Sequence, residues 1–193
     1  IGSSTLAVIR NNPHRFQLHS AVAHQNVEGM LAICREFSPK YVVMVDPDAA
    51  LQLKRRCCEE GISSQILAGE EELIALMADG EIETVVAAIV GAKGLLSSLA
   101  AVRAGKRILL ANKETLVVGG ALFMAEVARF KAEILPIDSE HNALFQCLPK
   151  EGGEAPLSGV DRLILTASGG PFRTYTHEQL AKVTVAEALA HPN

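Results

Sequence analysis

The stretch Thr84-Val85-Val86-Ala87-Ala88-Ile89-Val90-Gly91 decides the fold of this chain. It is apolar, rich in β-branched residues and ended by a glycine, as expected for a strand that is buried on both faces. A helical pattern follows at residues 95–104, with Gly105 in the position of a C-terminal cap. A second apolar run comes next at residues 107–110. A strand, a helix and a strand joined by short connections predict a parallel sheet with right-handed crossovers.

The same alternation continues in both directions along the chain. Upstream, the patterns predict strands at residues 16–23, 41–45 and 65–68 and helices at residues 27–37, 47–60 and 70–77. Downstream, they predict a helix at residues 114–129 and a strand at residues 133–137. The fold class is therefore α/β, with a Rossmann-like, doubly wound and mostly parallel sheet. Ligands of such sheets bind at the carboxyl ends of the strands.

Composition narrows the class of protein further. The chain has 193 residues, 49% of them hydrophobic, with no tryptophan and a formal net charge of −4. This charge gives no electrostatic footprint for a nucleic acid or an anionic membrane. No apolar run reaches the roughly 18 residues of a membrane span. Four cysteines without Cys-x-x-Cys spacing are expected to be free thiols in a reducing compartment.

The regular alternation of predicted strands and helices becomes less clear after Lys131. We expect a nucleotide-binding domain at residues 1–131 and the first part of an α+β catalytic domain at residues 132–193. In this second part, a surface loop is predicted at residues 151–154 and a strand at residues 162–166. The chain opens on a helical pattern without a preceding strand and stops at His191-Pro192-Asn193, which we interpret as a fragment cut at both ends.

Two carboxylates, Asp138 and Glu140, follow the predicted strand at residues 133–137. Side chains two apart in extended backbone point the same way, and two carboxylates in one cleft repel unless a hard divalent cation neutralises them. The alternative is that Asp138 or Ser139 caps a helix that begins near His141. His141 is a weaker ligand candidate and fits a packing or orienting role.

Other candidate residues also follow predicted strands. Lys113 lies at a helix start, where the dipole disfavours a cation, so an anionic partner such as Glu114 or a ligand is expected. Gly2 resembles the end of a glycine-rich turn that binds a pyrophosphate. No carboxylate occurs in His24-Gln25-Asn26, which favours NADP over NAD. The loop Ser168-Gly169-Gly170-Pro171 is either a phosphate-binding loop or a plain turn.

Five motifs occur in an order that closely resembles the 1-deoxy-D-xylulose 5-phosphate reductoisomerase family. They are Ile1-Gly2-x-Ser4-Thr5-Leu6, Ala88-Ile89-Val90-Gly91, Leu110-Ala111-Asn112-Lys113-Glu114, Pro136-Ile137-Asp138-Ser139-Glu140-His141-Asn142-Ala143 and Ser168-Gly169-Gly170-Pro171-Phe172-Arg173. The resemblance runs the whole length of the chain, and the fourth motif combined with the third is highly specific.

The resemblance implies a role for each matching position. Residues implied to bind NADPH are Ile1, Gly2, His24, Gln25, Asn26, Asn112 and Glu114. Residues implied to bind substrate are Lys113, Ser139, Glu140, Ser168 and His191. Asp138 and Glu140 are implied to ligate Mg²⁺ or Mn²⁺ and, together with Lys113, to act in catalysis. Gln25 stands where many relatives have a basic residue, and Thr115 stands where the family often has serine.

The chemistry implied is an isomerisation of 1-deoxy-D-xylulose 5-phosphate followed by reduction with NADPH, giving 2-C-methyl-D-erythritol 4-phosphate for the non-mevalonate isoprenoid route. The family also implies a homodimer in the bacterial cytosol or in plastids, with no nucleic-acid or membrane partner. Because the family continues past residue 193 into a mobile loop, a third metal carboxylate and a helical domain, we expect this chain alone to be inactive.

Two alternatives remain open from the residues. Another NADP-dependent Rossmann oxidoreductase would need no metal and would retain activity after chelation. A nucleotide-binding module without catalysis would tolerate alanine at Asp138 or Glu140, whereas loss of either carboxylate should impair a metal site.

Overall fold

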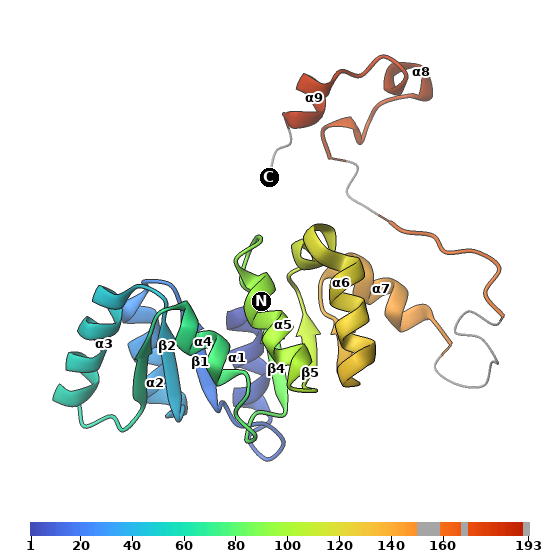
Figure 1. Cartoon of the computed structure of the whole chain (residues 1–193). Helices are drawn as coiled ribbons and strands as arrows, with labels where there is room; N and C mark the ends of the chain where they lie inside the picture. Colours follow the sequence, from blue (N-terminus) through green and yellow to red (C-terminus); the bar gives the residue numbers. More distant parts are fainter. Residues whose placement is uncertain (150–158, 167–169, 191–193) are drawn as a thin grey trace. The chain divides into compact units, whose positions relative to one another are not determined.

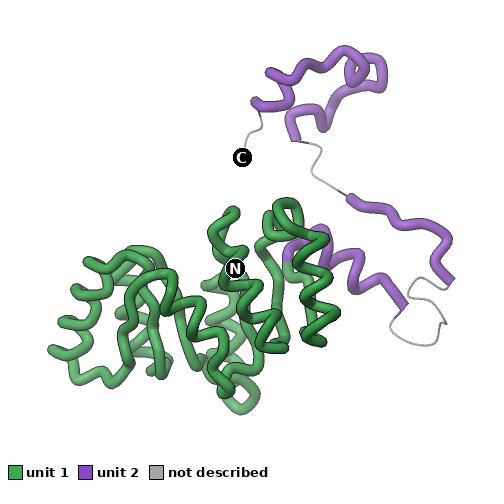
Figure 2. The backbone as a smooth tube through the Cα atoms, in the orientation of Figure 1, with its two compact units in different colours: residues 1–137 green, residues 138–193 purple. Residues whose placement is uncertain are grey.

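Short apolar strands alternate with helices through the first 137 residues, as the sequence pattern predicts (Figure 1). The computed structural model describes residues 1–149, 159–166 and 170–190. It divides the chain into two units, Ile1–Ile137 and Asp138–Asn193 (Figure 2). No helix in the described ranges is both long and apolar enough to cross a membrane.

The first unit contains six strands and six helices among its residues. The strands are β1 (Ser20–Ala23), β2 (Tyr41–Met44), β3 (Gln65–Ala68), β4 (Thr84–Ala87), β5 (Arg107–Leu110) and β6 (Glu133–Pro136). The helices are α1 (Gly2–Asn11), α2 (Val27–Phe37), α3 (Pro47–Glu59), α4 (Glu70–Leu76), α5 (Gly94–Arg103) and α6 (Glu114–Phe130).

All strand pairs in this unit are parallel. Hydrogen bonds join them as two three-stranded sheets in the orders β1-β2-β3 and β4-β5-β6. In the middle of the second sheet, Leu109 of β5 pairs with Val86 on one side and Leu135 on the other. The prediction of an α/β fold with a mostly parallel, doubly wound sheet is confirmed, although the hydrogen bonds form two three-stranded sheets and not one continuous sheet.

Alternation along β2 explains how helices cover two faces of the first sheet. Val42 and Met44 are fully buried in a core shared with α2 and α3. Val43 is also fully buried, but it belongs to a second core. Successive side chains of a strand point to opposite faces, so these residues need apolar cover on both sides of the sheet.

The second core connects the two sheets. It contains Val43 of β2, Ile108 of β5, Val102 of α5 and Phe123 of α6, all of them fully buried. α5 lies between α4 and α6, which gives one layer of helices over this core. The two sheets are therefore parts of one packed unit.

The cysteines are free in the structure, as expected. Cys34 and Cys57 are buried in the core of α2 and α3, and burial raises the pKa of Cys57 to about 11. This thiol stays protonated near neutral pH, and the thiolate is the reactive form.

The second unit has much less packing. It contains α7 (Ser139–Cys147), a 3₁₀ turn η1 (Gly170–Phe172), α8 (His177–Leu180) and α9 (Val185–Leu189). No described residue from Asp138 onward is buried. The prediction of a strand at residues 162–166 is wrong, because this segment forms no ladder with any described residue. A strand needs a hydrogen-bonded neighbour, and sequence pattern alone cannot supply one.

Candidate functional site

The carboxyl edge of the two sheets is where the fold predicts a ligand. β1 and β4 are the first strands of the two sheets, and Val22 of β1 and Ala87 of β4 pack in the same core. Ligands of open α/β sheets bind beyond the carboxyl ends of the strands, at the point where the strand order reverses. The segments that follow these two strands are therefore the first candidates for a nucleotide site.

Helix α1 offers an open N-terminus for a phosphate group. It begins at Gly2 after Ile1, and no side chain caps it by a hydrogen bond. Ile1 and Gly2 are both exposed, and a Cβ on Gly2 would meet no other atom within 4 Å. Unpaired N–H groups and the helix dipole favour an anion at this position.

The segment after β1 contains three of the predicted cofactor residues. His24, Gln25 and Asn26 are all exposed. Asn26 also has a local role, because its side chain accepts a hydrogen bond of 2.9 Å from the backbone N–H of Gly29 and caps α2. The side chains of His24 and Gln25 make no hydrogen bond to another described residue, although their backbone carbonyls accept from Asp46 and Val27.

The turn between β5 and α6 combines a buried and an exposed residue. Asn112 is only 3% exposed, whereas Lys113 is exposed and Glu114 is half-buried. The side-chain amide of Asn112 donates to the carbonyl oxygens of Ile89 and Gly91, the latter at 2.9 Å. The three predicted residues are thus consecutive but face different surroundings.

The second unit begins with the predicted metal ligand Asp138. Its backbone is extended and its side chain caps α7, accepting a 3.2 Å hydrogen bond from the backbone N–H of His141. The ring Nδ1 of His141 lies 2.8 Å from the same carboxylate oxygen, Oδ2. In the described residues, no hydrogen bond reaches Oδ1 of Asp138. The capping interpretation is confirmed, and one carboxylate oxygen is left for another ligand.

The prediction that Asp138 and Glu140 point the same way from extended backbone is wrong. α7 begins at Ser139, so Glu140 lies in the first helical turn and not in extended backbone. Ser139 is exposed, and Glu140 is half-buried. Asp138 thus precedes α7, whereas Glu140 lies in its first turn. Successive residues of a helix are rotated by about 100°, so the rule for extended backbone does not apply to these two carboxylates.

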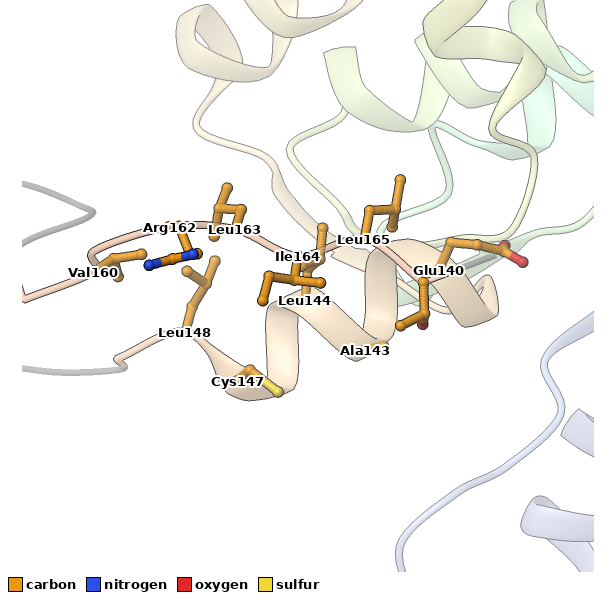
Figure 3. A pocket seen from close by; sticks show the side chains of 11 residues that line it. Glu140, Ala143, Leu144, Cys147, Leu148, Val160, Arg162, Leu163, Ile164 and Leu165 are labelled. Carbon is orange, nitrogen blue, oxygen red and sulfur yellow. The ribbon is translucent and has the colours of Figure 1, made fainter. Parts of the chain in front are cut away.

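Glu140 also lines a cavity of about 370 Å³ within the second unit (Figure 3). One side of this cavity is α7, with Leu144, and the other is the segment that contains Arg162 and Ile164. Glu140 and Arg162 are the charged residues among an otherwise largely apolar lining. The cavity places one predicted site residue at the end of an apolar groove.

A second cluster of potential metal ligands has a different character. Within residues 1–149, 159–166 and 170–190, the one trio with ligand atoms within 4.8 Å of one another is His19, Asp79 and Glu81. The Lys40 ammonium lies 2.5 Å from Glu81 and lowers the pKa of that carboxyl group. Lys106 donates to the backbone carbonyl of Asp79 at 2.6 Å. With Lys40 paired to Glu81 and Lys106 bonded to the backbone of Asp79, this trio is part of a network of ion pairs and hydrogen bonds at the amino ends of the strands.

Two predicted substrate residues, Ser168 and His191, lie outside the described residues. Thr115, for which the sequence predicted no role, is fully buried and donates its hydroxyl to Asn112 at 3.0 Å. The available signal was the spacing, because an asparagine three residues before a threonine at a helix start is a capping pattern.

Comparisons with known families cover nearly the whole chain. A family model described as 1-deoxy-D-xylulose 5-phosphate reductoisomerase matches residues 1–120. The model for the C-terminal domain of the same enzyme matches residues 134–193. The second match begins at residue 134, close to the division between the two units after Ile137.

Individual relatives agree with the family models. The reductoisomerases of Aeromonas hydrophila and Nitrosococcus oceani are 51% and 52% identical to this chain over its full length. A crystal structure of DOX-P reductoisomerase with NADPH, fosmidomycin and magnesium superimposes with a TM-score of 0.82 at 44% identity, over 100% of this chain and 48% of that one. The Zymomonas mobilis enzyme with NADPH gives 0.83 at 39% identity, over 99% of this chain and 48% of that one. The chain spans about 50% of the length of the curated relatives it matches.

Proposed function

Because the chain belongs to the 1-deoxy-D-xylulose 5-phosphate reductoisomerase family, we propose that it is the NADPH-binding part and the beginning of the catalytic part of such an enzyme. The intact protein would isomerise 1-deoxy-D-xylulose 5-phosphate and reduce the product with NADPH, with the help of a divalent metal ion, in isoprenoid biosynthesis. Residues 1–131 form the cofactor domain in this proposal, and residues 132–193 begin the catalytic domain.

The observation that carries the proposal is the state of Asp138. His141 engages Oδ2 of this carboxylate at 2.8 Å, and no described residue bonds to Oδ1. A histidine that orients a carboxylate from behind is a common arrangement at metal sites. Carboxylate oxygens suit Mg²⁺ or Mn²⁺, so the donor set of Asp138 and Glu140 fits this class of ion.

Features of the first unit support the cofactor assignment. The exposed segment His24-Gln25-Asn26 follows β1, and the uncapped N-terminus of α1 has open space at Gly2. We propose that Ile1 and Gly2 bind the pyrophosphate of NADPH and that residues 24–26 bind its ribose phosphate. Asn112 and Glu114 lie along the cofactor in the same proposal.

The remaining site residues would hold the sugar phosphate. Lys113 supplies a positive charge near the reacting oxygens, Ser139 and Glu140 contact the substrate, and Ser168 and His191 bind near its phosphate. When bound, a divalent cation stabilises the negative charge that develops on the substrate oxygens, and NADPH supplies the hydride. Lys113 orients the substrate for both steps.

A test in the full-length protein compares Glu140→Gln and Asp138→Asn with Asp161→Asn. Asp161 is an 88% exposed carboxylate in the same unit, so its amide variant is a matched control. We expect both site variants to weaken Mn²⁺ binding at least about 10-fold and to abolish NADPH oxidation with 1-deoxy-D-xylulose 5-phosphate, while NADPH binding persists. The control should keep all three properties.

Turnover that survives thorough chelation, or unchanged Mn²⁺ affinity in both site variants, would overturn the metal assignment. We also propose that the intact enzyme is a homodimer in the bacterial cytosol and that residues 1–193 alone do not catalyse the reaction. Substrate turnover by purified residues 1–193 would contradict the last point.

A further inference from the structure

The start of α6 is fixed by a buried network formed by Asn112, Thr115, Ile89 and Gly91, which we call the Asn112 network. Asn112 is 3% exposed and Thr115 is fully buried. The amide nitrogen of Asn112 donates to the carbonyl oxygens of Ile89 and Gly91, and its Oδ1 accepts from the backbone N–H and hydroxyl of Thr115, both at 3.0 Å. All hydrogen-bonding positions of this side chain are therefore engaged.

The network joins two loops at the carboxyl edge of the second sheet. Ile89 and Gly91 lie between β4 and α5, whereas Asn112 lies between β5 and α6. Gly91 has a φ of 74°, which a side chain disfavours, and this turn directs its carbonyl oxygen to Asn112. The loop that follows β4 is thereby held to the residue that precedes Lys113.

Gly94 leaves the space that Asn112 requires. A Cβ at this position would lie 2.4 Å from Nδ2 of Asn112 and 2.8 Å from the carbonyl oxygen of Ile89. Real Cβ atoms do not approach so closely, so any larger residue would displace the amide or the loop. The Asn112 network therefore requires glycine at position 94.

α6 does not continue as one regular helix from its first turn to its end. The helix is interrupted at Gly119, where φ is −145° and ψ is 31°. Phe123 secures the segment after this kink in the core, whereas Val117 and Val118 before the kink are 85% and 60% exposed. The first turn, which begins next to Lys113, therefore depends on its own inward contacts. One of these contacts is the hydrogen bond from the Thr115 hydroxyl to Asn112.

We infer that Thr115 is a positioning residue that acts through Asn112. Its hydroxyl fixes the Asn112 amide, and that amide holds the Ile89–Gly91 loop and the Lys113 backbone in one arrangement. This inference rests on the proposed function, because it assigns the network to the placement of Lys113 against the sugar phosphate. Asn112 contributes to the site through these buried bonds, since its side chain has no position left for a ligand.

The test compares Thr115→Val with Thr115→Ser in the full-length enzyme. Valine keeps the shape but removes the hydroxyl donor, and serine restores that donor. Thr84→Val is the matched control, because Thr84 is exposed at the start of β4. If the valine variant does not fold, Thr115→Ala removes the same donor and is judged by the same criteria.

We expect Thr115→Val to lower kcat/KM per folded molecule by about 10- to 100-fold, the effect of a small misplacement of a substrate-binding group. Amide hydrogen exchange at residues 89–91 should become at least about 10-fold faster. Thr115→Ser should restore both quantities, and Thr84→Val should change neither. A purely stabilising role would change only the unfolding temperature.

Wild-type kcat/KM and exchange in Thr115→Val would overturn the inference, as would a serine variant as impaired as the valine variant. If the wild-type enzyme does not oxidise NADPH with the sugar phosphate, the proposed function fails instead. The exchange of residues 89–91 needs no turnover, so unchanged exchange in Thr115→Val would still refute the network's role.

Discussion

The two units of the chain obtain their order from different sources (Figure 2). The first unit has two apolar cores, and its helices are fixed because they cover parallel sheets. The second unit has no buried residue in its described part, and its helices are held mainly by local bonds at their ends. Capping and helix propensity form short helices in both units, but among the described residues only the first unit adds a buried core.

This difference separates two ways of building a site. In the first unit, Lys113 follows a network of hydrogen bonds centred on the buried side chains of Asn112 and Thr115. In the second unit, Asp138 is fixed by Ser139-Glu140-His141 itself, through the helix cap and the ring of His141. In the proposed function, the residues assigned to the cofactor and Lys113 are thus held by the fold of the first unit, and Asp138, assigned to the metal, is held by the local sequence of the second unit.

The largest expected effect distinguishes two phenylalanines. Phe123 is fully buried in the first unit, whereas Phe145 is 37% exposed on α7. Phe123→Ala should lower the free energy of unfolding by about 3–5 kcal/mol, because it leaves a cavity in the shared core. Phe145→Ala should lower it by less than about 1 kcal/mol. Urea denaturation of the chain followed by circular dichroism measures both values.

Equal losses for the two phenylalanine variants would show that the second unit contributes to the same cooperative core. Such a result would contradict the conclusion that the stability gained from burying apolar side chains is concentrated in the first unit. Phe123→Leu serves as a control for volume, and its loss should lie between those of the alanine variants.

A smaller effect should follow from removing a helix cap in each unit. Asp46 accepts a 2.8 Å hydrogen bond from the backbone N–H of Ala49 and begins α3, whose inner face is buried. Asp46→Ala should lower the free energy of unfolding by about 1 kcal/mol. Thr184→Ala removes the cap of α9, which has no buried residue, and should leave the urea midpoint unchanged. A shifted midpoint in Thr184→Ala would contradict this expectation.

Sequence patterns predicted the first unit well because each element there satisfies a local and a tertiary requirement together. The predicted bounds of β3 and β5 match the structure, and Asp46-Pro47 begins α3 as expected. The strand predicted at residues 162–166 failed for the opposite reason. Its run of apolar residues fits a strand, but no described strand pairs with it to complete a ladder.

The site was predictable in its residue types but not in its orientations. The acidic pair after β6 was recognised, yet the start of α7 at Ser139 changed how Glu140 is presented. Asn112 was identified from its motif, but its burial depends on Gly91 and Gly94, which follow β4 and not β5. Contacts between separate segments of a chain follow from packing, and a single sequence does not display them.

The smallest expected effect concerns the pH dependence of two glutamates. Arg103 donates to Glu126 at 2.6 Å and lowers the pKa of that carboxyl group, which is nearly buried in the first unit. The backbone N–H of Thr184 lowers the pKa of Glu187 in α9 in the same direction. Both folded-state pKa values lie below that of an unfolded glutamate, which is about 4.3.

A lowered carboxyl pKa adds stability above the unfolded value, and this stability is lost as the pH falls through the folded value. The loss of stability in Glu126→Gln should therefore be largest near neutral pH and disappear in acid, when wild-type Glu126 is also protonated. Glu187→Gln should leave the urea midpoint unchanged at every pH, because α9 has no part in a buried core. Urea midpoints of both variants and the wild type, measured from about pH 7 down to about pH 3, test these two expectations. A pH-independent deficit in Glu126→Gln would mean that lost packing, and not the ion pair with Arg103, causes its instability.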